Sequence, residues 1–318
     1  MNKNGERFLV TGSTGFAGSC IVRELVRQKK HVSIIVHDKK NNWRLRDILS
    51  KLDIYECDLL SQSLDSIVAR IMPTYIFHLA SYGSLRSENI ITQMIDVNIK
   101  GTINLINATK RHRFKLFINT GSSSEYGIKN KPMQEVDILE PINDYGITKS
   151  AATLFCQKEA IRNNLPIITL RLFSPYGYFE DKSRLIPSII VNALKNQPIE
   201  LSFPNNVRDF IFIEDVVNAY IKATESKSNP GEIFNIGTGK QHRISDVVSL
   251  VLQITNSNSE VVWGKVKKQA RQIESKKWEA DIFKAQEILK WTPEHELQIG
   301  LKKTIEWFRQ YSYLYAQF

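Results

Sequence analysis

Tyr145 and Lys149 are the pair in this sequence whose types and spacing could carry out proton transfer. They open a helical run at 145–162, and residues four apart lie on one face of a helix. A cation beside a phenol lowers the phenol pKa, which makes tyrosine usable as an acid or base near neutral pH. Such pairs are also common on solvated helix faces, so the chemistry depends on what else the fold brings to them.

Three hydroxyl side chains, Ser122, Ser123 and Ser124, follow an apolar strand at 115–119. Hydroxyls at the carboxyl end of a parallel strand face the ligand crevice of the sheet. One of them can bond the substrate oxygen that gains or loses a proton. Without the other motifs, three serines would predict only a loop.

A glycine turn follows the first apolar strand, 8–10, and opens a helix that carries apolar residues at helical spacing. A dinucleotide-binding turn requires this context. Its glycines allow a tight turn and a close approach of the backbone to a diphosphate, while the helix N-terminus supplies amide donors. The turn residues expected to contact a cofactor are Gly12, Thr14, Gly15, Phe16 and Gly18.

The end of the second strand, 32–36, should select between the two nicotinamide dinucleotides. An acidic residue there would bond the adenosine ribose, whereas a basic residue would accept a 2′-phosphate. The strand is followed by His37, and Asp38 stands one place late among Lys39, Lys40 and Arg44. This pattern favours NADP(H) over NAD(H), with His37 and Lys39 as cofactor-binding residues.

Strands alternate with helices up to 173, which predicts an α/β fold of the Rossmann type with a doubly wound parallel sheet. The later elements are expected as strands at 53–56, 75–79, 115–119 and 166–173 and helices at 64–70, 97–111 and 145–162. Asp58, after the third strand, either meets the adenine or caps the next helix.

Prolines punctuate shorter elements beyond Pro175, which predicts a smaller mixed α/β C-terminal lobe for the substrate. The expected division is a dinucleotide-binding domain at 1–175 and a substrate lobe at 176–318. Segments near 208–240 are expected to return to the first domain.

The composition, 42% hydrophobic and 24% charged, is that of an ordinary globular protein, with no apolar stretch of membrane-spanning length. The polar N-terminus leaves no room for a signal peptide, and the three isolated cysteines lack metal-site spacing. We therefore expect a cytoplasmic protein without a metal. The net charge of +10 could indicate a nucleic-acid or membrane surface, but its even spread favours a solvated surface and neither partner.

Together these motifs resemble the extended short-chain dehydrogenase/reductases of the NAD-dependent epimerase/dehydratase family, over about 8–308. The resemblance rests on the glycine turn, Asp58-Leu59, His78-Leu79-Ala80-Ser81, Asn98 with Gly101-Thr102, 122–127, Tyr145 with Lys149, 171–177, 208–211 and 281–291.

The resemblance implies a role for each matching residue. Tyr145 would be the acid/base, Lys149 its activating partner, and Ser122 the catalytic serine, with Ser123 as the fallback. Further cofactor contacts would be Asp58, Leu59, Leu79, Ala80, Ser81 and Phe173, and substrate contacts would be Tyr82, Ser123, Ser124, Ser174, Arg208 and Arg271.

Arg208 and Arg271 match positions that grip a substrate diphosphate. Alternatively, Arg208 pairs with Asp209 or Glu214, and Arg271 is only solvated. The resemblance also implies a nucleotide-diphosphate sugar as substrate and a homodimer.

The reaction is less closely defined. Sugar 4,6-dehydratases resemble Thr-Asp-Glu where this chain has Ser122-Ser123-Ser124, so dehydration is discounted. Stretches 174–187 and 274–278 are most similar to the CDP-abequose and CDP-paratose synthase group. This similarity favours reduction of the C4 ketone of an NDP-4-keto-6-deoxyhexose in deoxysugar biosynthesis for a surface glycan such as O-antigen. The alternatives are an NAD-dependent nucleotide-sugar 4-epimerase and a non-enzymatic redox-sensing or nucleic-acid-binding protein on the same fold.

Overall fold

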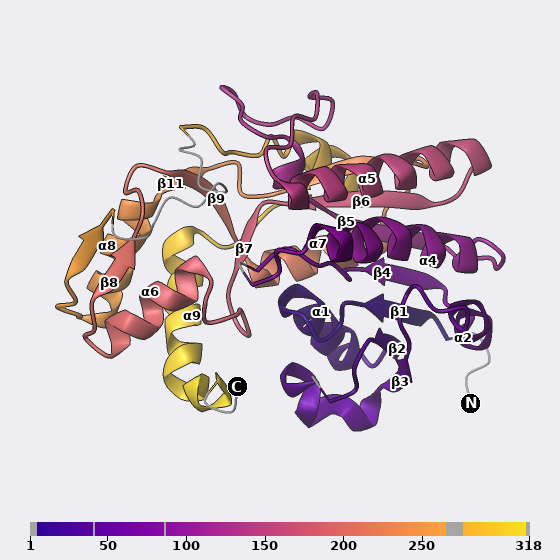
Figure 1. The fold of residues 1–318 in the computed structure, drawn as a ribbon, viewed down its shortest axis with the longest axis horizontal. Coiled ribbons are helices and arrows are strands. Elements are labelled where there is room, and N and C mark those ends of the chain that lie inside the picture. The colour runs from indigo at the N-terminus through magenta and orange to yellow at the C-terminus, as the bar shows by residue number, and fades with distance from the viewer. Residues whose placement is uncertain (1–4, 41, 86, 265–275, 316–318) are drawn as a thin grey trace.

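The fold is known from a computed structural model that describes residues 5–40, 42–85, 87–264 and 276–315 (Figure 1). Its centre is a parallel sheet of seven strands, all paired in parallel. From edge to edge the strands are β10 (Ile233–Ile236), β6 (Ile167–Leu172), β5 (Leu116–Ser122), β4 (Tyr75–His78), β1 (Arg7–Thr11), β2 (His31–Val36) and β3 (Asp53–Glu56). The strand order reverses at β1, which creates a crevice at the carboxyl ends of β1 and β4. The predicted doubly wound sheet is thus confirmed.

Helices cover both faces of this sheet because residues alternate along each strand. Phe8 and Val10 of β1 belong to a core with α1 (Phe16–Arg27) and α7 (Ile213–Glu225). Leu9 belongs to a second core on the opposite face. The helices of that face are α2 (Leu64–Ile71), α4 (Thr102–Thr109) and α5 (Asp144–Asn163).

The helix expected at 97–111 is wrong at both ends. The chain forms a short helix α3 (Ile91–Met94), then a π-helical turn η2 (Ile95–Gly101), and only then α4, which ends at Thr109. A π turn inserts an extra residue into the helical hydrogen-bond pattern, which apolar periodicity does not reveal, and such turns are frequent at functional sites.

The second lobe lies beside the sheet in Figure 1. It contains two small sheets, in which β7 (Ser174–Tyr176), β9 (Val207–Phe212) and β11 (Gln241–Arg243) form one and β8 (Ile199–Leu201) and β12 (Val261–Trp263) form the other. Its helices are α6 (Leu185–Leu194), α8 (Ile244–Thr255) and α9 (Leu297–Tyr311) with the 3-10 turn η5 (Ser312–Tyr315). The π turn η4 (Ala285–Leu289) instead packs on α7 and on β10 of the large sheet. The core that holds Val10 also includes Ile190 of α6, so apolar packing is continuous between the lobes.

The remaining 3-10 turns lie near the sheet. η1 (Trp43–Lys51) follows β2 and packs on α1, and η3 (Ser123–Glu125) follows β5. β10 follows β7, β8 and β9 of the second lobe in the sequence, but it pairs with β6 of the large sheet. The chain therefore returns to the large sheet late in the sequence.

Candidate active site

The glycine turn after β1 has a backbone that only glycine accommodates. Gly12 has φ +68°, and a Cβ there would lie 2.4 Å from the backbone nitrogen of Ala80. A Cβ on Gly18 would lie 2.1 Å from the carbonyl oxygen of Gly12. Gly15 is the N-cap of α1, so the amides of the first helical turn remain available to a ligand. These residues fit the diphosphate of a dinucleotide, with Leu79 and Ala80 from the end of β4 against the turn.

A chain of buried hydrogen bonds runs from β1 toward α5. It passes through residues that the sequence did not identify as site residues. His78 contacts Thr11 Oγ1 through Nδ1 at 2.7 Å and Thr102 Oγ1 through Nε2 at 2.8 Å. The Thr102 hydroxyl already donates to the Asn98 carbonyl, so the Thr102 oxygen must accept the hydrogen bond from Nε2–H of His78. In the neutral ring the proton therefore lies on Nε2, and Nδ1 accepts from the Thr11 hydroxyl. Burial lowers the pKa of His78 to about 3, which agrees with a neutral ring.

Asn98 continues this chain from the π turn. Its Nδ2 donates to the Tyr82 carbonyl at 2.8 Å and to Thr148 Oγ1 at 2.9 Å, while its Oδ1 accepts from the Tyr82 amide. Thr148 in turn donates to the Tyr145 carbonyl at 3.0 Å. Backbone groups of Tyr82 are therefore held beside α5. A histidine directly after an apolar strand was the sequence signal that could have drawn attention to this chain.

The residues after β2 are only partly as expected. The His37 side chain is 82% exposed with Nδ1 3.6 Å from the Asp58 carboxylate, and Lys39 lies 3.9 Å from Glu56. Arg44, however, donates to the carbonyls of Phe179 at 2.7 Å and Thr14 at 3.1 Å. It is therefore occupied in linking the glycine turn to the second lobe, and its inclusion among the cations available to a 2′-phosphate is wrong.

Asp58 and Leu59 lie where β3 leaves the sheet. Asp58 Oδ1 accepts from the Leu60 amide at 2.8 Å, whereas the N-cap of α2 is Ser63. The alternative that Asp58 caps this helix is therefore wrong. The Leu59 carbonyl accepts from Asn104 at 3.0 Å, which ties this segment to α4.

Tyr145 and Lys149 lie in the first turns of α5, whose N-cap Asn143 accepts the Gly146 amide at 2.8 Å. Tyr145 is half-buried and Lys149 is buried. Burial raises the pKa of Tyr145 to about 12, and the largest opposing influences are the charge of Arg184 and a side-chain hydrogen bond with Ser122. Among the cations, Arg184 is the one that most lowers the Tyr145 pKa in this structure, and the activating role of Lys149 stays a prediction. Burial also lowers the pKa of Lys149, opposed by the Glu125 carboxylate.

Ser122 is held by a capping box at the end of β5. Its hydroxyl accepts from the Ser124 amide at 3.2 Å, and its own amide donates to Glu125 Oε1 at 2.7 Å. Glu125 also accepts from Thr153 of α5 at 3.0 Å. These bonds fix the serine hydroxyl against the helix that carries Tyr145.

Ser123 and Ser124 are less available than Ser122. The Trp278 indole N–H donates to Ser123 Oγ at 3.1 Å, and the side chains of Trp278 and Ser123 are both buried. Ser124 lies with its carbonyl against Gly146, where a Cβ would be 2.4 Å away. Trp278 was not predicted as a site residue, and nothing in its local sequence marked it.

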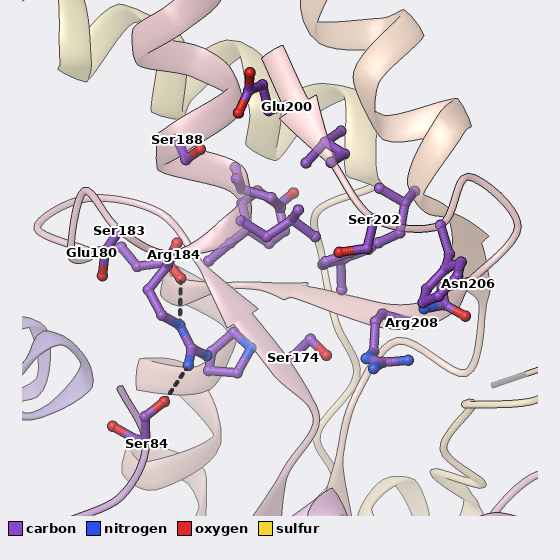
Figure 2. A pocket seen from close by; sticks show the side chains of 18 residues that line it. Ser84, Ser174, Glu180, Ser183, Arg184, Ser188, Glu200, Ser202, Asn206 and Arg208 are labelled. Carbon is purple, nitrogen blue, oxygen red and sulfur yellow. Dashed lines mark hydrogen bonds and ion pairs between the residues drawn. The ribbon is translucent and has the colours of Figure 1, made fainter. Parts of the chain in front are cut away.

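A pocket of about 350 Å³ opens between the lobes (Figure 2). Ser84, Glu180 and Arg184 lie together at one end, Ser174 lies between, and Ser202, Asn206 and Arg208 lie at the other end (Figure 2). Arg184 donates to the Ser84 carbonyl at 2.7 Å, so this end of the pocket joins the two lobes. Its charge also acts on the phenol of Tyr145, although Tyr145 is not one of the residues that line the pocket.

Arg208 is a cation without a carboxylate partner among the described residues. It donates to the Val207 carbonyl at 2.7 Å and lies over the Trp278 ring at 4.8 Å. The two alternatives that paired it are wrong, because Asp209 accepts from Thr238, Gly239 and Ala280, and Glu214 binds Tyr178 and Lys303. Burial lowers the Arg208 pKa to about 10, which leaves it charged at neutral pH.

Three further expected contacts lie around the pocket. Ser174 lines it, Phe173 in the neighbouring position of the chain is buried, and Ser81 is half-buried in the loop after β4. Arg271 lies outside the described residues. Within the described ranges, no three His, Cys, Asp or Glu side chains are grouped to hold a metal, and no helix is long and apolar enough to cross a membrane.

Comparisons with known proteins agree with this geometry. Residues 8–237 match the family described as NAD dependent epimerase/dehydratase. UDP-glucose 4-epimerase of Lactobacillus helveticus is 28% identical, over 91% of this chain and 93% of that protein.

Two solved structures are similar over nearly the whole chain. The Thermotoga maritima UDP-glucose 4-epimerase with UDP-glucose has a TM-score of 0.86 at 27% identity, covering 96% of this chain and 99% of its own. The Bacillus cereus UDP-glucuronic acid 4-epimerase with UDP-glucuronic acid and NAD has a TM-score of 0.86 at 26% identity, with the same coverage.

Proposed function

The chain belongs to the NAD dependent epimerase/dehydratase family, and on that premise we propose that it is a nucleotide-sugar 4-epimerase that uses a retained NAD. The observation that carries the proposal is the Tyr145–Ser122 hydrogen bond after β5, together with a pocket that holds Arg208, a cation without a carboxylate partner among the described residues. This conclusion favours the alternative over C4 ketone reduction, because several of the similar proteins are named 4-epimerases and one of these is described with NAD.

The residues suggest how the sugar oxygen is handled. In its phenolate form, which the Arg184 charge and the Ser122 hydrogen bond favour against burial, Tyr145 takes the proton of the C4 hydroxyl during oxidation and returns it when the ketone is reduced. Ser122 shares a hydrogen bond with that phenol, so both hydroxyls address one substrate oxygen. A bound nicotinamide dinucleotide supplies the hydride acceptor and donor. Inversion requires only that the ketone presents its opposite face before reduction.

Arg208 and the pocket suggest how the rest of the substrate lies. A guanidinium without a carboxylate partner is suited to a diphosphate, which it can bind through two parallel hydrogen bonds. With the diphosphate on Arg208, the sugar extends toward Arg184, and the nucleoside extends toward Glu200 of β8, which lines the same pocket (Figure 2).

A 4-ketoreductase that consumes NADPH, like the CDP-abequose and CDP-paratose synthase group, is the second candidate function. The observation that favours it is the pair of exposed basic side chains after β2, His37 and Lys39, where a 2′-phosphate would lie. Replacing both by alanine should weaken NADP binding and leave NAD binding unchanged if this candidate holds.

The deciding experiment identifies the released cofactor and then measures turnover. Mass spectrometry of the denatured protein should find NAD, and proton NMR should show interconversion of UDP-glucose and UDP-galactose without added reductant. The Tyr145→Phe variant is the control. Stoichiometric NADPH oxidation with a 4-keto-6-deoxy sugar nucleotide, without any such interconversion, would instead establish the reductase.

A further inference from the structure

Glu180 is a buried carboxylate at the sugar end of the pocket. Its side chain is 5% exposed, and the cation paired with it is Arg184, whose Nε lies 3.5 Å from Oε1. Oε2 is buried without a hydrogen-bond partner among the described residues. Burial raises the pKa of Glu180 to about 7, opposed by Arg184 and a hydrogen bond from the Gly177 amide, so about half of the molecules carry this charge at neutral pH. A buried charge is costly, so its retention calls for a reason in the site it borders.

Arg184 faces the reacting end of the same pocket. Its side chain is 40% exposed, it donates to the Ser84 carbonyl, and its charge acts on the phenol of Tyr145. Figure 2 shows its guanidinium between Glu180 and Ser84. A sugar bound at this end of the pocket therefore meets this side chain.

The charges at this end do not leave a net positive site. Glu180 offsets Arg184, and the carboxylate of Glu88, which accepts the Gly83 amide at 2.9 Å, adds a negative charge that also acts on Tyr145. A sugar carboxylate that enters a pocket loses its hydration and must regain that free energy from an uncompensated cation. An uncharged hexose has no such requirement.

We propose that Glu180 determines substrate specificity by neutralising Arg184, so that the site accepts an uncharged sugar and disfavours a uronic acid. The inference rests on the proposed function, whose sugar it specifies. Glu180 acts through Arg184 and is therefore a positioning residue, not a catalytic one.

The test compares kcat/KM for UDP-glucose and UDP-glucuronate in three proteins. Wild type should prefer UDP-glucose, and Glu180→Gln should shift the ratio toward UDP-glucuronate by about tenfold or more, since Arg184 is then uncompensated. Asp181→Asn is the matched control, because it removes the same charge from the next residue, whose carboxylate binds Ser183 instead. Its ratio should remain within about twofold of wild type.

A reciprocal variant keeps the test decisive if Glu180→Gln folds poorly. Arg184→Gln leaves Glu180 and Glu88 as the local charges. The ratio of kcat/KM for the two sugar nucleotides should therefore move further toward UDP-glucose in this variant. A ratio unchanged in both variants, or a wild type that prefers UDP-glucuronate, overturns the proposal.

Calorimetric binding of the same two sugar nucleotides separates this inference from the proposed function. If neither is epimerised, the proposed function fails, but the ratio of their Kd values still tests Glu180. Equal ratios in wild type and Glu180→Gln would then refute its role in specificity.

Discussion

The Nε of Arg171 donates a 2.7 Å hydrogen bond to the carboxylate of Glu125, and both side chains are fully buried beneath Ser122. Arg171 also donates to the Tyr126 hydroxyl at 2.9 Å, and Tyr126 donates to Asn235 at 2.7 Å. The pair thus joins β5, β6 and β10 directly under the serine that contacts Tyr145. Its role is to hold the η3 turn in place.

The first prediction concerns this ion pair. Arg171→Met should lower the free energy of unfolding by about 3–5 kcal/mol, because it leaves the Glu125 charge buried and unpaired. Turnover should fall as well, since Glu125 also holds the Ser122 amide. Guanidinium unfolding and kcat measure the two effects. Arg27→Met, which breaks an exposed pair with Glu24, should unfold like wild type; similar curves for both variants would contradict the prediction.

The second prediction concerns the acid/base. Tyr145→Phe should retain dinucleotide binding and lose turnover by about 10²–10⁴-fold, because the proton of the C4 hydroxyl then has no acceptor. Steady-state kinetics and cofactor titration measure the two quantities. Tyr313→Phe, at an exposed position, is the matched control. Near-normal turnover in the Tyr145 variant would remove it from the mechanism.

The third prediction concerns the pH dependence of stability. His78 is neutral in the folded protein with a pKa of about 3, against 6.5 as its ordinary value. Below pH 6.5 the unfolded chain binds a proton that the folded chain rejects. Stability from this group is therefore present above pH 6.5 and is lost at about 1.4 kcal/mol per pH unit as the pH falls toward 3.

His78→Gln should be less stable at pH 7 but show a shallower loss of stability between pH 6 and pH 4. Urea unfolding across this pH range is the measurement. His37→Gln, at an exposed position, should follow the wild-type slope. Parallel curves for wild type and His78→Gln would show that the buried imidazole does not titrate as expected.

The fourth prediction concerns self-association. Ile147, Leu154 and Ile161 recur at seven-residue spacing on α5 and are each exposed by half or more. Together they form an outward apolar stripe, a kind of surface that marks interfaces. We expect two copies to pair through it, so Leu154→Glu with Ile161→Glu should give a monomer by sedimentation equilibrium. Val136→Glu, elsewhere on the surface, should remain dimeric; a monomeric wild type would refute the expectation.

Local patterns in the sequence were enough to predict most of the large sheet. The strands at 53–56 and 75–79 and the helix around 145–162 appear within a residue or two of their expected bounds, because apolar runs and helical spacing are patterns of neighbouring residues. The glycine turn was equally readable, since Gly12 and Gly18 make contacts that no side chain allows. These features depend on residues that are neighbours in the chain.

The site was decided by contacts between residues far apart in the chain. Trp278 with Ser123, Arg171 with Glu125 and Arg44 with Phe179 each join different elements, and no periodic pattern records such partners. The same holds for Arg184, whose charge rather than that of Lys149 most strongly opposes the raised pKa of Tyr145. The sequence by itself determined which chemical groups exist and which elements carry them. Only the tertiary structure decided which groups meet, and burial and charge at those meetings set their protonation and their roles.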